Sequence, residues 1–467
     1  MLRVKDLKEI PIFNNFKSKR ELIGKNTIDV HEGVLTDKAT KQDFVFSKLP
    51  SLVNREDVSR ILELVGSCKL DEDPDSVDGM CTHEMYVISD KIDSKDTMKL
   101  DNDPKEKSKR TEIRKKIKQI IDPILDNYIT PFVLKKYCSH LPPDKQYKPF
   151  YSLIRNYNEQ KRLTHAPHRD GHAYCTVVVS LSDYEKEYTG GLYVATTEKY
   201  KHTVVLNRGD AIVHECDLLH GVKVKGTRWS WIVWYRDSLD KDNIKEHFKS
   251  KATDGNAIYE SLYADTFNDS DKILWHTKSC DNGNSISMVK LARGYLKLLP
   301  SVMSFEPENA EKLYRHAIEV SEDPNAYYGL AQMLLWRINK NPKEIGQGIL
   351  DDVIGLLEES AKGGNTYAMF NLGIAHLYGY TGNTNMEVAN EWFYESSLAE
   401  GFYVSSMYHN YKKNSIMSEN MKQKAESLGY GTKWRRNARN STGIGGASGV
   451  DLNLNWPTQP DIFPEKF

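Results

Sequence analysis

Residues 209–237 read GDAIVHECDLLHGVKVKGTRWSWIVWYRD, and this stretch decides the fold class. Two of its apolar, β-branched and aromatic runs, 210–216 and 229–235, have the composition of strands. The Lys225-Gly226 pair in front of the second run is typical of a tight turn. No helical period separates the two runs. Strands that follow one another without an intervening helix favour an antiparallel sandwich or barrel.

The same pattern continues upstream, where turn signals at Thr189-Gly190-Gly191 and Asn207-Arg208-Gly209 separate further short apolar runs. These runs cover residues 150–157, 176–181, 191–196 and 203–206. Two helices are predicted before them. Residues 54–68 place apolar side chains at helical intervals behind an asparagine cap, and isoleucines recur three and four positions apart up to Ile124.

His168-Arg169-Asp170 and His220 form a candidate metal-ligand set within this β-rich region. On an extended strand, residues i and i+2 project to the same face, so His168 and Asp170 can bind one ion together. We expect the strand that begins after Gly209 to end at His220 and to bring its imidazole alongside. Two imidazoles and one carboxylate with open positions are typical of non-haem Fe(II) oxygenases. A His-x-Asp pair alone is weak evidence, because a surface histidine beside an aspartate has the same sequence.

An arginine and a serine at the start of the last strand are candidate ligand-binding residues. The run 229–235 after Arg228 contains no acidic residue, and burial of an unpaired guanidinium is costly. Ser230 lies two residues further on and therefore on the same face. The two side chains can share one carboxylate.

Taken in order, these features resemble the prolyl-4-hydroxylase-like branch of the Fe(II)- and 2-oxoglutarate-dependent dioxygenases. The resemblance covers residues 44–238 and rests on Tyr157 before His-x-Asp, Gly190-Gly191, Gly209-Asp210 before the distal histidine, and then Arg228. It implies a double-stranded β-helix, or jelly-roll. It also implies an enzyme that couples oxidative decarboxylation of 2-oxoglutarate to succinate and CO2 with hydroxylation of a protein substrate.

The resemblance implies a role for each candidate residue. The iron ligands are expected to be His168, Asp170 and His220. Arg228, with support from Ser230, is expected to bind the far carboxylate of 2-oxoglutarate. Tyr157 is expected to hydrogen-bond the co-substrate, with a core aromatic residue at a strand end as the alternative. The cofactor is then Fe(II), the co-substrates are 2-oxoglutarate and dioxygen, and ascorbate is the reductant.

Two positions depart from the family pattern. Arg228 follows His220 by eight residues, a shorter interval than is common in the family. His214 stands where the family has phenylalanine, so it either contacts the ligands or substrate or packs as a core residue. His165 and His172 lack the i, i+2 relation to an aspartate, and we assign them no role.

An internal repeat begins near residue 283. Its copies start at residues 283, 322, 364 and 401, and steps of 37 to 42 residues are the size of a helix-turn-helix repeat. Glycine opens three copies, whereas the copy at Glu322 lacks it. The copies resemble Sel-like repeats, which are relatives of tetratricopeptide repeats. The resemblance implies an α-solenoid that binds proteins, with a plain helical bundle as the alternative.

We therefore predict a multi-domain α+β chain in which a jelly-roll oxygenase domain precedes an α-solenoid. Its parts are an irregular or partly paired lead-in (1–43), the dioxygenase domain (44–238), a linker (239–282), Sel-like repeats (283–432) and a disordered tail (433–467).

Composition restricts the partners. The 467 residues carry 64 Lys and Arg against 65 Asp and Glu, so no global positive field attracts nucleic acid. No apolar run approaches the ~18 residues needed to span a membrane, and the charged first ten residues disfavour a secretory signal. Six scattered cysteines favour a reducing compartment. We expect a cytoplasmic protein, with the nucleus as the alternative because of the basic cluster 105–118, that binds a polypeptide through its repeats.

Two other functions stay open from the sequence. The first is a scaffold in which the repeats act and the oxygenase domain is inactive. The second is an oxygenase of a small molecule, because substrate choice in this family depends on variable loops.

Overall fold

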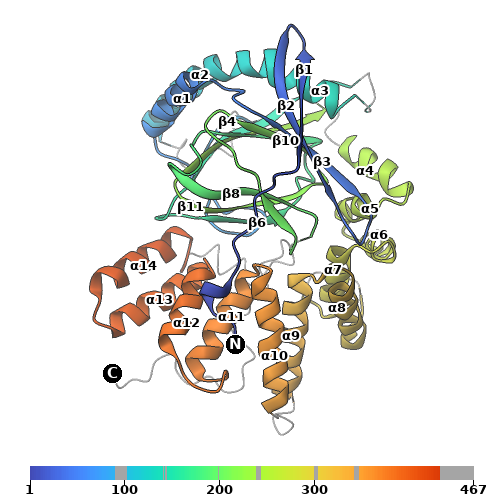
Figure 1. Ribbon diagram of the computed structural model, residues 1–467, viewed down its shortest axis with the longest axis vertical. Coiled ribbons are helices and arrows are strands. Elements are labelled where there is room, and N and C mark those ends of the chain that lie inside the picture. The colour runs from blue at the N-terminus through green and yellow to red at the C-terminus, as the bar shows by residue number, and fades with distance from the viewer. Residues whose placement is uncertain are drawn as a thin grey trace.

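The structure is a computed structural model that describes residues 1–89, 103–139, 141, 145–197, 199–237, 243–298, 303–340 and 347–431. Two antiparallel sheets lie above a stack of helices (Figure 1). Within these ranges, no helix has both the length and the apolar character that a membrane span requires. The predicted tail, 433–467, lies outside the described residues.

The larger sheet has eight strands in the order β1-β2-β3-β10-β7-β12-β5-β4, all in antiparallel pairs. Its strands in chain order are β1 (Phe16–Ile23), β2 (Asn26–Thr36), β3 (Asp43–Leu49), β4 (Glu84–Ile88), β5 (Tyr147–Tyr157), β7 (Cys175–Ser180), β10 (Ala211–Glu215) and β12 (Arg228–Asp237). The smaller sheet has the order β6-β11-β8-β9. Its strands are β6 (Thr164–His168), β8 (Tyr188–Ala195), β9 (Lys201–Thr203) and β11 (Leu219–Gly226).

Residues 16–36 form the regular hairpin β1–β2, which corrects the prediction of an irregular lead-in over residues 1–43. The hairpin extends the large sheet because β2 pairs with β3, with Leu35 opposite Phe44. Most β1 side chains are exposed, so the strand shows no apolar alternation that a sequence pattern can report. Backbone pairing with β2 forms this strand instead.

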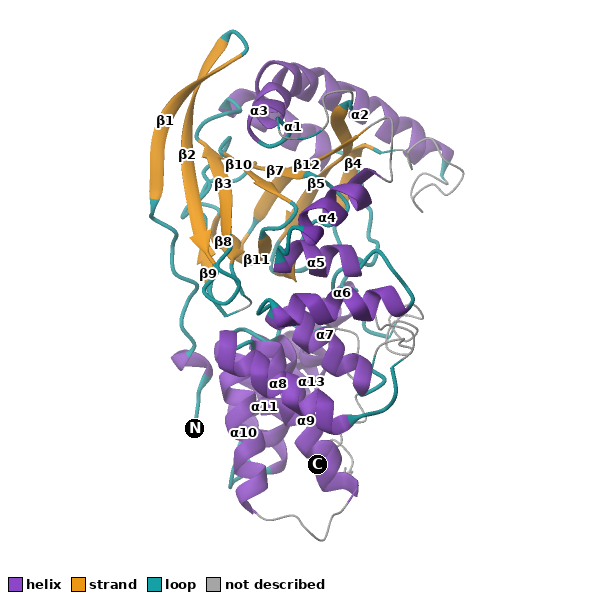
Figure 2. Ribbon diagram, turned by 90° about the vertical axis from the view of Figure 1, so that its right-hand side faces the viewer, coloured by secondary structure: helices purple, strands orange, loops and turns teal. Residues whose placement is uncertain are grey.

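Three helices cover one face of the large sheet (Figure 2). They are α1 (Arg55–Gly66), α2 (Pro104–Ile124) and α3 (Thr130–Lys136), with a π-helical turn at Leu125–Ile129 between the last two. The predicted helices are present: Asn54 caps α1, and the isoleucines of α2 are buried. Burial of such an apolar stripe against a sheet is the main source of stability for an amphipathic helix.

The other face of the large sheet packs on the small sheet and on two helices. Val178, Ile212 and Ile232 from the large sheet share one core with Leu192 and Val194 of β8. Helices α4 (Asn243–Thr253) and α5 (Ala257–Ala264) contribute their own apolar side chains to that core. The prediction of a linker over residues 239–282 is therefore wrong for this stretch, because these helices are part of the packed β region.

The remaining helices stack in pairs below the sheets, as Figures 1 and 2 show. They are α6 (Ser270–Asp281), α7 (Ser285–Tyr295), α8 (Pro307–Ser321), α9 (Pro324–Lys340), α10 (Gln347–Lys362), α11 (Thr366–Tyr378), α12 (Met386–Glu395), α13 (Ala399–Tyr411) and α14 (Ser415–Ser427). The whole is a mixed α/β architecture of antiparallel sheets and many helices.

The start of each predicted repeat coincides with a helix start. Gly283 and Gly364 have φ of +85° and +88°, and Asn284 and Asn365 after them cap α7 and α11. The copy without glycine has Glu322 in the same left-handed conformation, at φ +50°. The left-handed backbone conformation at the start of the repeat is therefore kept at Glu322, although glycine is not.

The fourth copy differs from its prediction. Gly401 lies in the first turn of α13, two residues after the helix starts at Ala399, and α12 ends at Glu395. A Cβ atom at Gly401 would lie 2.3 Å from the Phe393 carbonyl oxygen. Glycine at position 401 therefore permits the close approach of α12 and α13.

The helical stack touches the small sheet and the loops beside it. Polar contacts across this boundary are Tyr200 Oη to Glu322 Oε2 (2.7 Å), Lys201 Nζ to the Gly363 carbonyl (3.0 Å) and Lys223 Nζ to Glu395 Oε1 (2.7 Å). The Ser427 hydroxyl also donates to the Gln160 carbonyl at 3.1 Å. The stack is thus anchored on the β region at both β9 and β11.

Candidate metal centre

The end of β6 and the start of β11 bring His168, Asp170 and His220 together. His168 and His220 are register partners, and one ligand atom from each of the three residues lies within 4.8 Å of the other two. One expectation is corrected: β10 ends at Glu215, and His220 is the second residue of the separate strand β11. The chain turns through Cys216 and Asp217 between the two strands.

Backbone carbonyls orient both imidazoles. The Nδ1 atom of His168 lies 2.9 Å from the Ala166 carbonyl, and that of His220 lies 3.1 Å from the Leu218 carbonyl. A carbonyl only accepts, so each Nδ1 carries the proton and each Nε2 presents a lone pair. Both Nε2 atoms lie 3.6 Å from an Asp170 carboxylate oxygen. The three ligand atoms therefore converge with the tautomers that metal binding needs.

The carboxylate of Asp170 is held by two donors on one oxygen. Thr176 Oγ1 donates to Oδ2 at 2.5 Å, and Trp234 Nε1 donates to the same atom at 3.0 Å. Neither donor bonds Oδ1, which remains available on the side of His168. This arrangement fixes the carboxylate plane while one oxygen is left for a cation.

The protonation states at neutral pH suit a divalent cation. Burial, together with neighbouring His165, lowers the pKa of His168 to about 4. Burial and His168 lower the pKa of His220 to about 4. Burial alone would raise the pKa of Asp170, but the surrounding histidines, His220 foremost, lower it overall. Two neutral imidazoles and one carboxylate result, which is the form that binds metal without first losing a proton.

Arg228 and Ser230 are buried on the same face of β12 as Trp234. Arg228 is 1% exposed, and its Nε and Nη2 atoms have no hydrogen-bond partner among the described residues. The hydroxyl of Ser230, at 0% exposure, also lacks one there. A buried guanidinium without an acceptor is strongly destabilised. The chemistry that satisfies both groups together is that of a small carboxylate, which accepts several hydrogen bonds and carries the opposite charge.

Tyr157 and Tyr188 lie beside this pair. Tyr157 is opposite Arg228 in the β5–β12 register, so the two side chains share a face. The Tyr188 ring lies 5.8 Å from the Arg228 guanidinium, and its hydroxyl donates to the Leu206 carbonyl at 2.5 Å. Tyr157 is fully buried against Tyr188 and Val222. This packing is that of a core aromatic residue, and its hydrogen bond to a co-substrate stays a prediction.

His214 lies on the metal-facing side of β10 and packs against a ligand. Its ring centroid is 4.4 Å from that of His220, and its Nδ1 lies 2.7 Å from the Glu215 carbonyl. Burial and His220 lower its pKa to about 3. Its Nε2 atom has no partner among the described residues. His214 is therefore a neutral, packed ring in the position where the resembled family has phenylalanine.

Three residues near the ligands were not predicted. Thr176 and Trp234 hold Asp170, and the His165 ring lies 4.3 Å from that of His168. Strand parity could have found Trp234, because it is six residues from Arg228 and therefore on the same face. No sequence pattern indicates the contacts of Thr176 and His165 with the candidate ligands, because these contacts depend on strand register.

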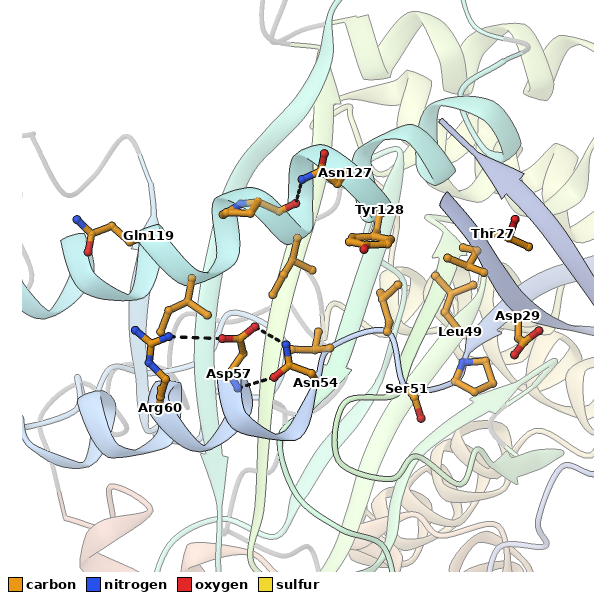
Figure 3. A pocket seen from close by; sticks show the side chains of 17 residues that line it. Thr27, Asp29, Leu49, Ser51, Asn54, Asp57, Arg60, Gln119, Asn127 and Tyr128 are labelled. Carbon is orange, nitrogen blue, oxygen red and sulfur yellow. Dashed lines mark hydrogen bonds and ion pairs between the residues drawn. The ribbon is translucent and has the colours of Figure 1, made fainter. Parts of the chain in front are cut away.

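A separate cleft lies on the helix-covered side of the large sheet (Figure 3). Its volume is about 740 Å³, and it is lined by residues of β2, α1 and α2. Its polar groups bond one another: Asn54 donates to Asp57 at 2.6 Å, and Asp57 pairs with Arg60 at 3.7 Å. None of the candidate ligands lines this cleft. These bonds stabilise the start of α1, and none of the buried unpartnered side-chain atoms of the described residues belongs to this lining.

Parts of this chain are similar to solved structures of two kinds. A Sel1 repeat protein from Oxalobacter formigenes is 18% identical over 41% of this chain, with a TM-score of 0.35, and the chain spans only 57% of its length. An oxidoreductase of the 2OG-Fe(II) oxygenase family from Burkholderia pseudomallei is 18% identical, covers 41% of this chain and 84% of its own, and has a TM-score of 0.30. A prolyl-4-hydroxylase from Pseudomonas putida is 12% identical, covers 41% and 92%, and has a TM-score of 0.24. No family model and no curated protein matches the chain.

Proposed function

We propose that this protein is an Fe(II)- and 2-oxoglutarate-dependent dioxygenase that hydroxylates a polypeptide, with its helical repeats as the protein-binding region. One observation carries the proposal: His168, Asp170 and His220 converge within 4.8 Å in metal-binding tautomers, in the same β core that buries Arg228 and Ser230 without acceptors among the described residues. Folding alone does not explain the second feature, because it leaves buried polar atoms of Arg228 and Ser230 without a partner among the described residues.

The iron would supply the oxidative chemistry, in which decarboxylation of 2-oxoglutarate to succinate and CO2 accompanies hydroxylation of the substrate. The protein residues bind and orient. His168, Asp170 and His220 would hold the metal on one face and leave its other positions open. Arg228 would pair with the far carboxylate of 2-oxoglutarate, and Ser230 would donate its hydroxyl to the same group.

The finer fold assignments belong to the same proposal. We infer that the two facing sheets form a double-stranded β-helix that spans residues 44–238, since every neighbouring strand pair in them is antiparallel and one core joins them. We infer that residues 283–432 are Sel-like repeats, because the caps recur at the predicted repeat starts. Stacked helix pairs present extended surfaces, which suit a polypeptide partner.

The test is an anaerobic titration of the metal-free protein with Fe(II) and then 2-oxoglutarate. A chelated oxo-acid gives a weak visible metal-to-ligand charge-transfer band, and we expect that band in the unaltered protein. His168→Ala should abolish it by removing a ligand. Folded protein that shows no band under these conditions would refute the oxygenase and favour a scaffold whose repeats act alone.

Substrate class needs a second measurement. Succinate release is measured first with 2-oxoglutarate alone. It is then measured with candidate peptides and with small-molecule substrates such as free amino acids. We expect peptides to stimulate succinate release and to gain one oxygen atom by mass spectrometry. Stimulation by a small molecule alone would retain the enzyme class and reject the polypeptide substrate.

A further inference from the structure

The loop between α1 and β4, residues 71–82, carries two buried carboxylates to the side of the metal centre. It is a closed turn: the Asp75 amide donates to the Met80 carbonyl at 2.9 Å, and the Gly79 amide donates to the Asp75 carbonyl at 2.9 Å. The side chains of Asp75 and Asp78 are only 6% and 3% exposed. Buried carboxylates are retained only with partners, and here the partners lie on or next to β6.

Asp75 holds the imidazole that lies against a ligand. Its Oδ1 is 3.3 Å from His165 Nε2, while Arg155 Nη1 lies 3.3 Å from His165 Nδ1. A guanidinium only donates, so Nδ1 is the acceptor and Nε2 carries the proton toward Asp75. The ring is thus held at both nitrogens. It lies 4.3 Å, centroid to centroid, from the ring of His168.

Asp78 holds the backbone of the same strand. Its Oδ2 accepts from the Ala166 amide at 3.3 Å, and the Ala166 carbonyl in turn accepts from His168 Nδ1 at 2.9 Å. Fully buried Arg162 pairs with the same carboxylate at 2.5 Å. One loop therefore fixes His168 in two ways, through the ring of His165 and through the peptide of Ala166.

The loop is held from outside by the last helix pair. Met80, 7% exposed, packs in a cluster with Ala399 and Phe402 of α13 and with Met421 and Ala425 of α14. The Arg162 guanidinium also reaches the Met80 carbonyl at 3.5 Å. A continuous set of contacts thus runs from the repeats to the first metal ligand, with no solvent-exposed step.

We propose that Asp75 and Asp78 are positioning residues for the metal centre, and that α13 and α14 hold in place the loop that carries them. The proposal deepens the proposed function and rests on it. In this arrangement the repeats are part of the structure that shapes the metal site, beyond any capture of a partner. Positioning of a ligand sets both the affinity for a metal and the geometry around it.

The experiment uses the full chain and Co(II), whose visible d–d absorption reports coordination geometry without turnover. Asp75→Asn should raise the Co(II) Kd on the order of tenfold, at the lower end of the 10- to 100-fold range for groups that orient ligands directly, and should alter the d–d spectrum. Met80→Ala should act in the same direction, by roughly threefold. If Asp75→Asn does not fold, His165→Phe retains a flat ring and removes both polar contacts, with the same expected loss.

The matched control is Glu84→Gln. Glu84 of β4 is also buried and bonds Arg155 of β5 at 2.7 Å, whereas Asp75 bonds His165 of β6 directly. This change removes one carboxylate from the same cluster, so it should lower stability and leave the Co(II) spectrum unchanged. Equal effects of Glu84→Gln and Asp75→Asn would overturn the proposal, as would an unchanged Kd and spectrum in Asp75→Asn. Failure of the unaltered protein to bind Co(II) would refute the proposed function as well. Failure of the positioning proposal alone would leave Co(II) binding by the unaltered protein intact, so the two outcomes are distinguishable.

Discussion

The two faces of strand β12 differ in how their buried groups are satisfied. On the helix-covered face, Trp231 is fully buried and donates its indole N–H to Ser152 Oγ at 2.7 Å. On the opposite face, Arg228 and Ser230 are equally buried, and their polar atoms have no acceptor or donor among the described residues. One strand thus carries a completed core on one side and an incomplete site on the other.

The difference shows where folding alone accounts for a residue and where it does not. Burial is the same on both faces, so burial does not distinguish them. A satisfied hydrogen bond contributes to stability, whereas an unsatisfied buried group lowers it. Residues kept at a loss of stability are candidates for binding a ligand. The first two predictions below test this distinction with one substitution on each face.

The largest effect is expected from Trp231→Ala on the helix-covered face. Loss of a buried indole should lower the free energy of unfolding by about 3–5 kcal/mol. The affinity of the folded protein for 2-oxoglutarate should change less than about twofold, because the opposite face keeps its side chains. Urea unfolding and titration of the charge-transfer band measure the two quantities. A parallel loss of affinity would show that the faces are not independent.

Arg228→Leu should give the reverse result. Its free energy of unfolding should be unchanged or higher, because the substitution removes a buried charge that has no acidic or hydrogen-bonding partner among the described residues. The affinity for 2-oxoglutarate should fall on the order of 100-fold, or about 2.7 kcal/mol, as expected when one partner of a buried charge pair is lost. The same two measurements apply. A destabilised variant that retains its affinity would mean that Arg228 serves the fold.

Strand parity explains how much of this site the sequence could predict. His168 with Asp170, and Arg228 with Ser230, are i, i+2 pairs, so their shared faces follow from local geometry. His220 required only a neighbouring strand. The repeat starts were equally local, since an asparagine cap after a left-handed residue is visible in the sequence at Gly283 and Gly364.

What the sequence could not predict depends on long-range packing. Asp75 meets His165 across ninety residues of chain, and no periodic pattern joins them. Strand β1 is formed by backbone pairing of mostly exposed residues with β2, which composition does not report. The sequence predicts a linker over α4 and α5 because it does not reveal that their apolar side chains, such as Phe248, pack against the sheets.

The His214→Phe variant tests a buried group on the side of the candidate ligands. The measured quantity is the pH dependence of the free energy of unfolding. In the folded protein the pKa of His214 is about 3, whereas an unfolded histidine takes up a proton near pH 6.5. The unfolded state therefore binds more protons below pH 6.5, and the free energy of unfolding falls as pH falls. Phenylalanine does not bind a proton. Between pH 7.5 and 5, the free energy of unfolding of the variant should therefore fall by about 1–2 kcal/mol less than that of the unaltered protein.

Urea unfolding of metal-free protein at the two pH values measures this difference. Burial raises the pKa of Glu215 to about 7 and that of Asp217 to about 6, so these acids oppose the histidine term. They are present in both proteins and cancel in the comparison. An equal pH dependence of the two proteins would mean that His214 is accessible to protons in the folded state.

The most closely matched effects are expected from two serines of neighbouring strands, both 0% exposed. Ser152→Ala removes the acceptor of the Trp231 indole and should lower the free energy of unfolding by about 1–3 kcal/mol, the cost of leaving a buried donor unsatisfied. Ser230→Ala removes a hydroxyl without a described partner, so stability should stay the same or rise, while 2-oxoglutarate affinity falls roughly fivefold, or about 1 kcal/mol. Both are measured by urea unfolding and band titration. If Ser230→Ala destabilises the protein as much as Ser152→Ala, the metal-facing side of β12 is a completed core, and the carboxylate site loses its physical basis.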